Sequence, residues 1–124
     1  MFELVLIDDK REVVEGLSRA IDWKAMQVSV HGFFSASEAM ANCMEHPPAL
    51  VITDICMPVM SGMEFTKSLR SVHPEVRVVL LTGYDDFTYA REGIRLGVVE
   101  YLSKPVDLDE VQSLVAKEKA CWEG

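Results

Sequence analysis

The sequence lacks several features that mark nucleic-acid-binding and membrane proteins. Acidic residues outnumber basic ones 20 to 12, which gives a formal charge of -8. No cluster of Lys or Arg offers the basic patch that a nucleic acid requires, so we expect no direct contact with nucleic acid. No apolar run approaches the roughly 20 residues that span a bilayer, so we expect no membrane segment.

Cysteine is also scarce. The three cysteines, Cys43, Cys56 and Cys121, are odd in number and have no C-x-x-C spacing. This pattern favours reduced thiols over a disulfide framework or a zinc site. The first residues lack the basic and apolar regions of a signal peptide. These absences predict a cytoplasmic protein.

The apolar content that is present fits one domain. The chain has 124 residues, and 49% of them are hydrophobic, which suits a single core of ordinary size. No linker, insertion or low-complexity tract interrupts the pattern. We therefore expect one domain over residues 1–124.

Five short runs of β-branched and aliphatic residues predict strands. They are Leu4–Ile7, Val28–Phe33, Leu50–Thr53, Val76–Thr82 and Val98–Leu102. Each run is followed by apolar residues at helical spacing. These are Val14, Leu17 and Ile21; Ala36, Ala39, Met40 and Cys43; Phe65, Leu69 and Val72; Phe87, Ala90 and Ile94; and Leu108, Val111 and Val115. Alternating strands and helices predict a parallel sheet covered on both faces, a three-layer α/β sandwich.

Local signals agree with five helices. Capping-box spacing occurs at Ser35 with Glu38, Ser61 with Glu64, and Asp107 with Glu110,. Gly97 suits the left-handed end of the fourth helix. Two further glycines fall inside predicted helices: we expect Gly16 to permit close packing and Gly93 to weaken the fourth helix.

Polar residues collect at the carboxyl ends of the predicted strands, where open α/β sheets place their sites. They are Asp8, Asp9, Asp54, Thr82 and Lys104. If the first and third strands are neighbours, three carboxylates share one pocket and repel one another. Either protons are retained or a divalent cation is bound. Oxygen ligands open to water favour Mg²⁺ or Mn²⁺, so we infer a Mg²⁺ site.

Each of these residues alone has an ordinary structural interpretation. A strand-end aspartate often caps a helix, a threonine is a good strand former, and a lysine is usually a solvated surface charge. Their joint placement changes the interpretation. A carboxylate nucleophile, a cation site, a hydroxyl donor and an ammonium group together suit phosphoryl transfer.

The chain resembles the receiver domain of two-component response regulators over nearly its whole length. The motifs that carry the resemblance are Ile7-Asp8-Asp9, the segment from Thr53 to Gly62 (Thr-Asp-Ile-Cys-Met-Pro-Val-Met-Ser-Gly), Leu81-Thr82-Gly83-Tyr84, and Tyr101-Leu102-Ser103-Lys104-Pro105. Two stretches, Ile21-Asp22-Trp23 and the segment from Gly83 to Phe87, resemble the subgroup with an AraC-type output domain. The resemblance implies a flavodoxin-like fold with five parallel strands in the order 2-1-3-4-5 and five helices.

The resemblance also implies a role for each site residue. Asp54 is the expected phosphoacceptor, while Asp8, Asp9, Asp54 and the backbone carbonyl of Cys56 are the expected Mg²⁺ ligands. Thr82 and Lys104 would contact the phosphoryl group, and Thr82 and Tyr101 would act as switch residues. A cis peptide is expected between Lys104 and Pro105. Residue 10 departs from the family pattern, because Lys10 replaces the acidic residue that often follows the aspartate pair.

The implied function is a phosphorylation-dependent signalling switch that accepts a phosphoryl group from a sensor histidine kinase. We expect a transcriptional output domain on the carboxyl side and a possible homodimer through helix 4, strand 5 and helix 5. Beyond self-catalysed acceptance and slow autodephosphorylation we expect no enzymatic turnover. Cys56 and Tyr84, two residues past Asp54 and Thr82, offer no carboxylate or amide that would orient an attacking water.

The residues argue against three other classes of protein. A Mg²⁺-dependent phosphohydrolase of the haloacid dehalogenase type needs Asp-x-Asp and a cap insertion, whereas this pair, Asp8 and Asp9, is adjacent and no cap fits. A flavodoxin-like electron carrier needs a hydroxyl- and glycine-rich phosphate loop after the first strand. This chain has Asp8-Asp9-Lys10-Arg11 there, which would repel a flavin phosphate. A receiver-shaped module that signals without phosphorylation would not need the intact set of site residues.

Overall fold

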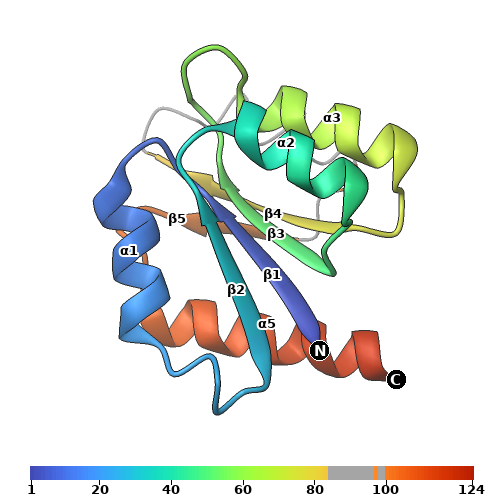
Figure 1. Cartoon of the computed structure of the whole chain (residues 1–124). Coiled ribbons are helices and arrows are strands. Elements are labelled where there is room, and N and C mark those ends of the chain that lie inside the picture. Colours follow the sequence, from blue (N-terminus) through green and yellow to red (C-terminus); the bar gives the residue numbers. More distant parts are fainter. Residues whose placement is uncertain (84–96, 98–99) are drawn as a thin grey trace.

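A five-stranded parallel sheet forms the centre of the molecule (Figure 1). The computed structural model describes residues 1–83, 97 and 100–124. The strands are β1 (Phe2–Ile7), β2 (Val28–Phe33), β3 (Leu50–Asp54), β4 (Arg77–Thr82) and β5 (Glu100–Ser103). They lie in the order β2-β1-β3-β4-β5, and every neighbouring pair is parallel. The predicted sheet and its strand order are confirmed.

Helices cover both faces of the sheet (Figure 1). The described helices are α1 (Arg11–Ala20), α2 (Ala36–Glu45), α3 (Gly62–Val72) and α5 (Leu108–Glu123). Buried residues of α1 and α5 belong to one apolar cluster, and those of α2 and α3 belong to another. The predicted fourth helix, with Phe87 and Gly93, lies outside the described residues. Among the described residues, no helix combines the length and apolar character that crossing a bilayer demands.

The predicted helix starts are supported by side-chain caps. Ser61 and Glu64 form a complete capping box at α3. The Ser35 hydroxyl accepts the Glu38 N–H at the start of α2, and Asp107 accepts two N–H groups at the start of α5. These bonds satisfy amide groups that the first turn of a helix leaves unpaired. Loop residues thereby help to set where α2, α3 and α5 begin.

Two glycines have different outcomes. Gly97 has a φ of 77°, the left-handed geometry that its predicted place after a helix requires. Gly16 does not permit close packing: a Cβ built there meets no atom within 4 Å. The expectation for Gly16 was wrong because this position of α1 points outward, away from the sheet. No neighbouring residue therefore requires a glycine at this position.

Side-chain alternation along the strands decides which polar groups meet. Leu6, Ile52 and Leu102 all belong to the cluster beneath α1 and α5. Side chains two residues apart in a strand share a face. Asp8, Asp54 and Lys104 each lie two residues beyond one of these three and continue the same rows.

Candidate functional site

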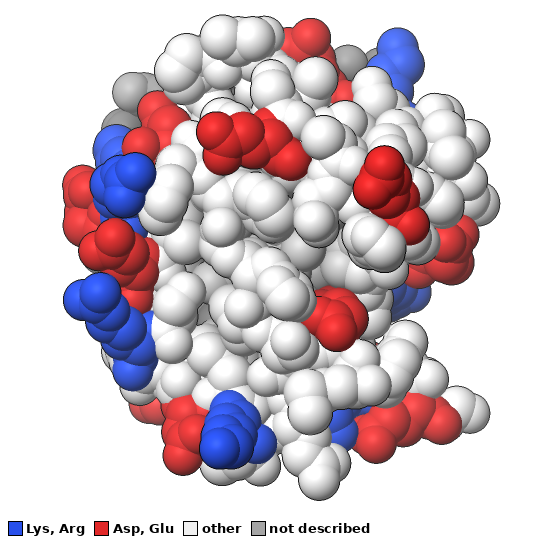
Figure 2. Space-filling view, viewed as in Figure 1, with Lys and Arg blue, Asp and Glu red and all other residues white. Residues whose placement is uncertain are grey.

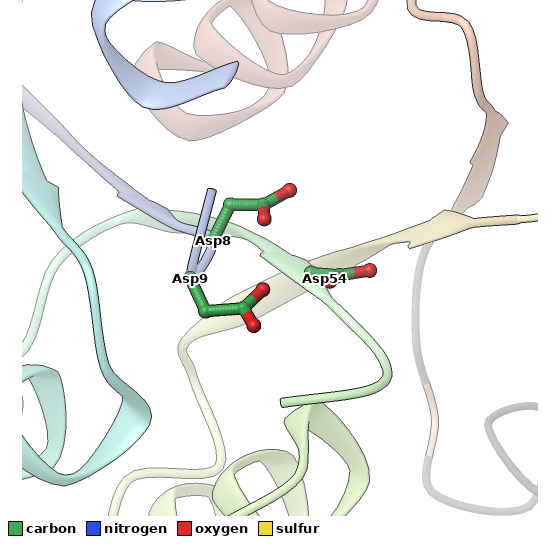
Figure 3. A group of neighbouring side chains, drawn as sticks. All are labelled: Asp8, Asp9 and Asp54. Carbon is green, nitrogen blue, oxygen red and sulfur yellow. The ribbon is translucent and has the colours of Figure 1, made fainter. Parts of the chain in front are cut away.

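The site lies at the carboxyl ends of β1, β3 and β5. Asp8 and Asp54 are buried, at 1% and 6% exposure, and Asp9 is exposed. One carboxylate oxygen from each of these three residues lies within 4.8 Å of the other two. Figure 3 shows the three side chains from two strand ends converging on one region. The sequence-predicted cluster is therefore assembled.

Lys104 connects two of these carboxylates across β4. Its Nζ atom lies 3.0 Å from Asp8 Oδ2 and 3.2 Å from Asp54 Oδ1. The side chain is 20% exposed, so the ammonium is only partly solvated. Among the described residues, the ammonium of Lys104 thus contacts two members of a cluster of three acidic side chains. The local charge remains negative, which suits a cation.

Backbone amides fix the two buried carboxylates further. Asp8 Oδ1 accepts the N–H of Lys10 at 2.9 Å, where α1 begins. Asp54 Oδ1 accepts the N–H of Ile55 at 2.9 Å. Each carboxylate is therefore held by one amide and by Lys104. Such pairing restricts the rotamers of both side chains before any ligand arrives.

The pKa values at the site reflect this crowding. Burial raises the pKa of Asp54, and the neighbouring charge of Asp8 raises it further, although Lys104 and the Ile55 N–H oppose both effects. Burial lowers the pKa of Lys104, but its bonds to Asp8 and Asp54 outweigh that effect and raise the pKa overall. Burial and the charge of Asp8 both disfavour the ionised form of Asp54, and a bound cation would favour it.

Thr82 and Tyr101 share the opposite face of the sheet. The Thr82 hydroxyl donates to the carbonyl of Leu102 at 3.4 Å. Tyr101 is half-buried and packs against the apolar cluster that includes Leu80, its partner in the β4–β5 register. Thr82 lies two residues beyond Leu80, so the two predicted switch residues occupy the same face at the end of adjacent strands.

The predicted loop features have separate outcomes. The peptide bond between Lys104 and Pro105 is cis. Cys56 lies in the loop after β3 and is exposed. Tyr84 lies outside the described residues. So does the rest of the segment to Phe87, which resembles AraC-type regulators.

Sequence reasoning missed the part played by Gly62. A Cβ at this position would collide with the backbone carbonyl of Asp54. The Gly62 N–H donates to the Ile55 carbonyl at 2.8 Å, and its own carbonyl accepts the buried Thr66 hydroxyl at 2.7 Å. The first turn of α3 therefore packs directly on the backbone of Asp54. A glycine directly after the Ser61 cap was the available signal.

Comparison with known proteins decides the family. The family described as response regulator receiver domain matches residues 4–116. The chain belongs to this family. In agreement, the receiver domain of AraT, a response regulator from Geobacillus stearothermophilus, superposes with a TM-score of 0.90 at 33% identity, covering 98% of this chain and 95% of that one.

Two curated relatives of this chain are named transcriptional regulatory proteins. The transcriptional regulatory protein YesN of Bacillus subtilis is 34% identical over 91% of this chain and 31% of its own length. The transcriptional regulatory protein HptR of Staphylococcus aureus is 35% identical over 94% of this chain and 46% of its own length. The chain thus spans less than half the length of these relatives. None of the relatives described here supports the phosphohydrolase alternative.

Proposed function

We propose that Asp54 accepts a phosphoryl group from a phosphohistidine of a sensor histidine kinase. The observation that carries this proposal is the shared contact of Lys104 with Asp8 and Asp54 inside a cluster of three carboxylates. An oxygen of Asp54 attacks the phosphorus, and the phosphorus–nitrogen bond breaks with its electron pair going to the imidazole. Lys104 is placed to stabilise the negative charge on the transferring oxygens.

The donor set fits Mg²⁺ or Mn²⁺. Asp8, Asp9 and Asp54 offer carboxylate oxygens within 4.8 Å of one another, and the carbonyl of Cys56 would add a fourth oxygen. Hard cations of this kind prefer oxygen ligands and retain water. A bound cation would neutralise charge on the phosphoryl oxygens and on the carboxylates. Asp9, the exposed member, is the residue whose loss should affect cation binding with least disturbance of the fold.

The proposed consequence of phosphorylation is a change at Thr82 and Tyr101. A phosphoryl group on Asp54 brings new charge and acceptor oxygens to the sheet edge. The Thr82 hydroxyl would exchange its long bond to Leu102 for a phosphoryl oxygen. The space that it leaves would admit the Tyr101 ring, because both side chains lie on one face.

The relatives support a wider role. We infer that residues 1–124 form one receiver domain of a cytoplasmic protein that regulates transcription, with an AraC-type output domain and a homodimer through helix 4, strand 5 and helix 5 as further expectations. The domain itself catalyses acceptance of the phosphoryl group. Hydrolysis of the acyl phosphate is slow, because Cys56 offers only a weakly hydrogen-bonding thiol near Asp54 to orient a water.

Incubation with acetyl phosphate and Mg²⁺, followed by intact-mass measurement, tests the proposal. We expect one added phosphoryl group in the parent, none in Asp54→Asn or in EDTA, and normal uptake in the matched surface control Asp109→Asn. Asp9→Asn should require more Mg²⁺ for the same uptake. Labelling that survives in Asp54→Asn or proceeds unchanged in EDTA would contradict the nucleophile or the cation site.

A further inference from the structure

Strand β2 presents an open edge at one side of the sheet. Among the described residues it pairs with β1 alone. The Asp8 N–H donates to the Phe33 carbonyl, so the backbone groups of Phe33 face β1. Because these groups alternate in direction along a strand, those of Val30 and Gly32 point away from the sheet. Gly32 is exposed, which leaves this backbone accessible.

The sequence of this edge carries none of the usual protection against pairing. Proteins commonly place charged residues, prolines or bulges on edge strands to prevent association. From Ala25 to Ser37 there is no Asp, Glu, Lys, Arg or Pro. The opposite edge strand, β5, is shorter, begins with an exposed Glu100 and is followed by Lys104 and Pro105. The two edges of one sheet therefore differ in how they exclude a further strand.

Charge singles out the same surface. The chain has a formal charge of -8, so two copies repel each other across most of their faces. Figure 2 shows mostly uncharged atoms over β2, with acidic and basic side chains gathered around that area. Close approach at β2 brings few like charges together. On the face that Figure 2 shows, this uncharged area is therefore suited to contact with a second copy of this acidic chain.

We propose that two copies of the chain associate by antiparallel pairing of their β2 edges. A strand edge offers alternating donors and acceptors, which another strand satisfies. In the register centred on Val30, the two Val30 residues exchange N–H to carbonyl bonds, and Gly32 donates to the Val28 carbonyl of the second copy. The Val28 N–H takes no part, because it already donates to Trp23. Symmetric pairing of one surface with itself gives a closed dimer.

The same register juxtaposes compatible side chains. Ser29 of one copy faces His31 of the other, and within one copy these two residues already lie 3.3 Å apart, Oγ to Nε2. His31 in turn contacts Glu3 at 2.6 Å. Because a single strand edge makes the contact, we expect a weak dimer that forms at high protein concentration. It is separate from the proposed phosphorylation and from the expected interface at β5 and α5.

Sedimentation equilibrium of the unphosphorylated chain over a concentration series tests the proposal. Val30→Pro removes an outward N–H while leaving the bonds to β1, whereas the matched control Val30→Ala truncates the same side chain and keeps the N–H. We expect Val30→Pro to weaken self-association by about tenfold or more and Val30→Ala to change it little. Ser29→Lys, which places an added charge opposite His31 of the second copy, should weaken it as well.

Several outcomes would overturn the β2 dimer. A parent chain that stays monomeric at every concentration does so directly, as does a dimer that Ser29→Lys leaves intact. A dimer that is lost in Glu100→Lys but kept in Val30→Pro would place the contact at β5. Circular dichroism verifies the fold of each variant. Phosphoryl uptake should be normal in all of them, so failure of this proposal is distinguishable from failure of the proposed function.

Discussion

The two ends of the central sheet hold buried charge in different ways. At the carboxyl end, Asp8 and Asp54 share the ammonium of Lys104 with the exposed Asp9 close by. At the amino end, the buried Glu118 of α5 has its own partner, because Arg77 of β4 donates to it at 2.7 Å. One end therefore carries an excess of negative charge and the other is balanced.

The balanced end is built for packing. Its ion pair joins β4 to α5, and the bond to Glu118 raises the pKa of Arg77. Nearby, the rings of Phe2 and Trp122 meet edge to face at 5.3 Å between centroids. At the carboxyl end of the sheet, burial raises the pKa of the Asp54 carboxylate. The contrast teaches that a buried charge is not in itself functional, whereas buried carboxylates without matching positive charge are candidates for a ligand site.

Removal of the shared ammonium should produce the largest functional effect. In the proposed transfer, Lys104→Met would leave the phosphoryl group without a fixed positive charge, so we expect phosphoryl uptake to slow by about 100-fold or more. The initial rate of uptake from acetyl phosphate, followed by intact mass, measures this. Lys117→Met, which removes an exposed lysine of α5, is the control. Equal rates of uptake for the two variants would show that Lys104 has only a structural role.

Breaking the balanced pair should affect stability alone. Arg77→Met strands the buried Glu118 carboxylate, and we expect a loss of about 2–3 kcal/mol in the free energy of unfolding, moderated because Arg77 is half-exposed. Urea unfolding measures the loss. In the double variant Arg77→Met/Glu118→Leu, apolar packing replaces the pair and much of the stability should return. A slower phosphoryl uptake in either variant would show that the two ends are coupled.

The raised pKa of Asp54 predicts a pH dependence. Between the ordinary value of 3.8 and the raised one, the folded protein holds a proton that the unfolded chain has lost. The free energy of unfolding therefore falls as the pH rises through that window. In EDTA, Asp54→Asn should become increasingly more stable than the parent as the pH rises above about 4. Parallel stability curves for the two proteins at all pH values would show that Asp54 bears no electrostatic strain.

Addition of Mg²⁺ sharpens the same comparison. In the proposed site the cation would bind only the folded cluster, so it should raise the stability of the parent more than that of Asp54→Asn. Thermal melts with and without Mg²⁺ measure both gains. Arg77→Met should keep the full gain, since its charge change lies at the other end of the sheet.

The sequence was informative where local chemistry and position coincide. Asp8, Asp54 and Lys104 follow strong strand patterns, and parallel strands bring such ends to one edge. The Ser61 capping box is likewise a local signal. By contrast, Arg77 and Glu118 are 41 residues apart, and each resembles an ordinary surface charge in sequence. Their pairing depends on the tertiary placement of α5, which periodicity does not specify.

The two glycines Gly62 and Gly16 show that sequence pattern does not predict tertiary packing. In the sequence Gly62 is only one residue of a longer motif, yet its lack of a side chain lets α3 pack on the Asp54 backbone. Gly16 was expected to pack closely and faces open space. Local pattern places a glycine inside a helix or loop, but only the packed neighbours show whether a side chain would fit.

Gly16→Ala should give the smallest effect and isolates helix propensity from packing. The added methyl meets no atom within 4 Å, and alanine favours the helical interior over glycine by about 0.5–1 kcal/mol. We expect a gain of that size in urea unfolding and an unchanged rate of phosphoryl uptake. Gly62→Ala is the opposite control: the same methyl collides with the Asp54 backbone, so it should lower both stability and uptake. A loss of stability in Gly16→Ala would mean that α1 packs more closely there than the structure shows.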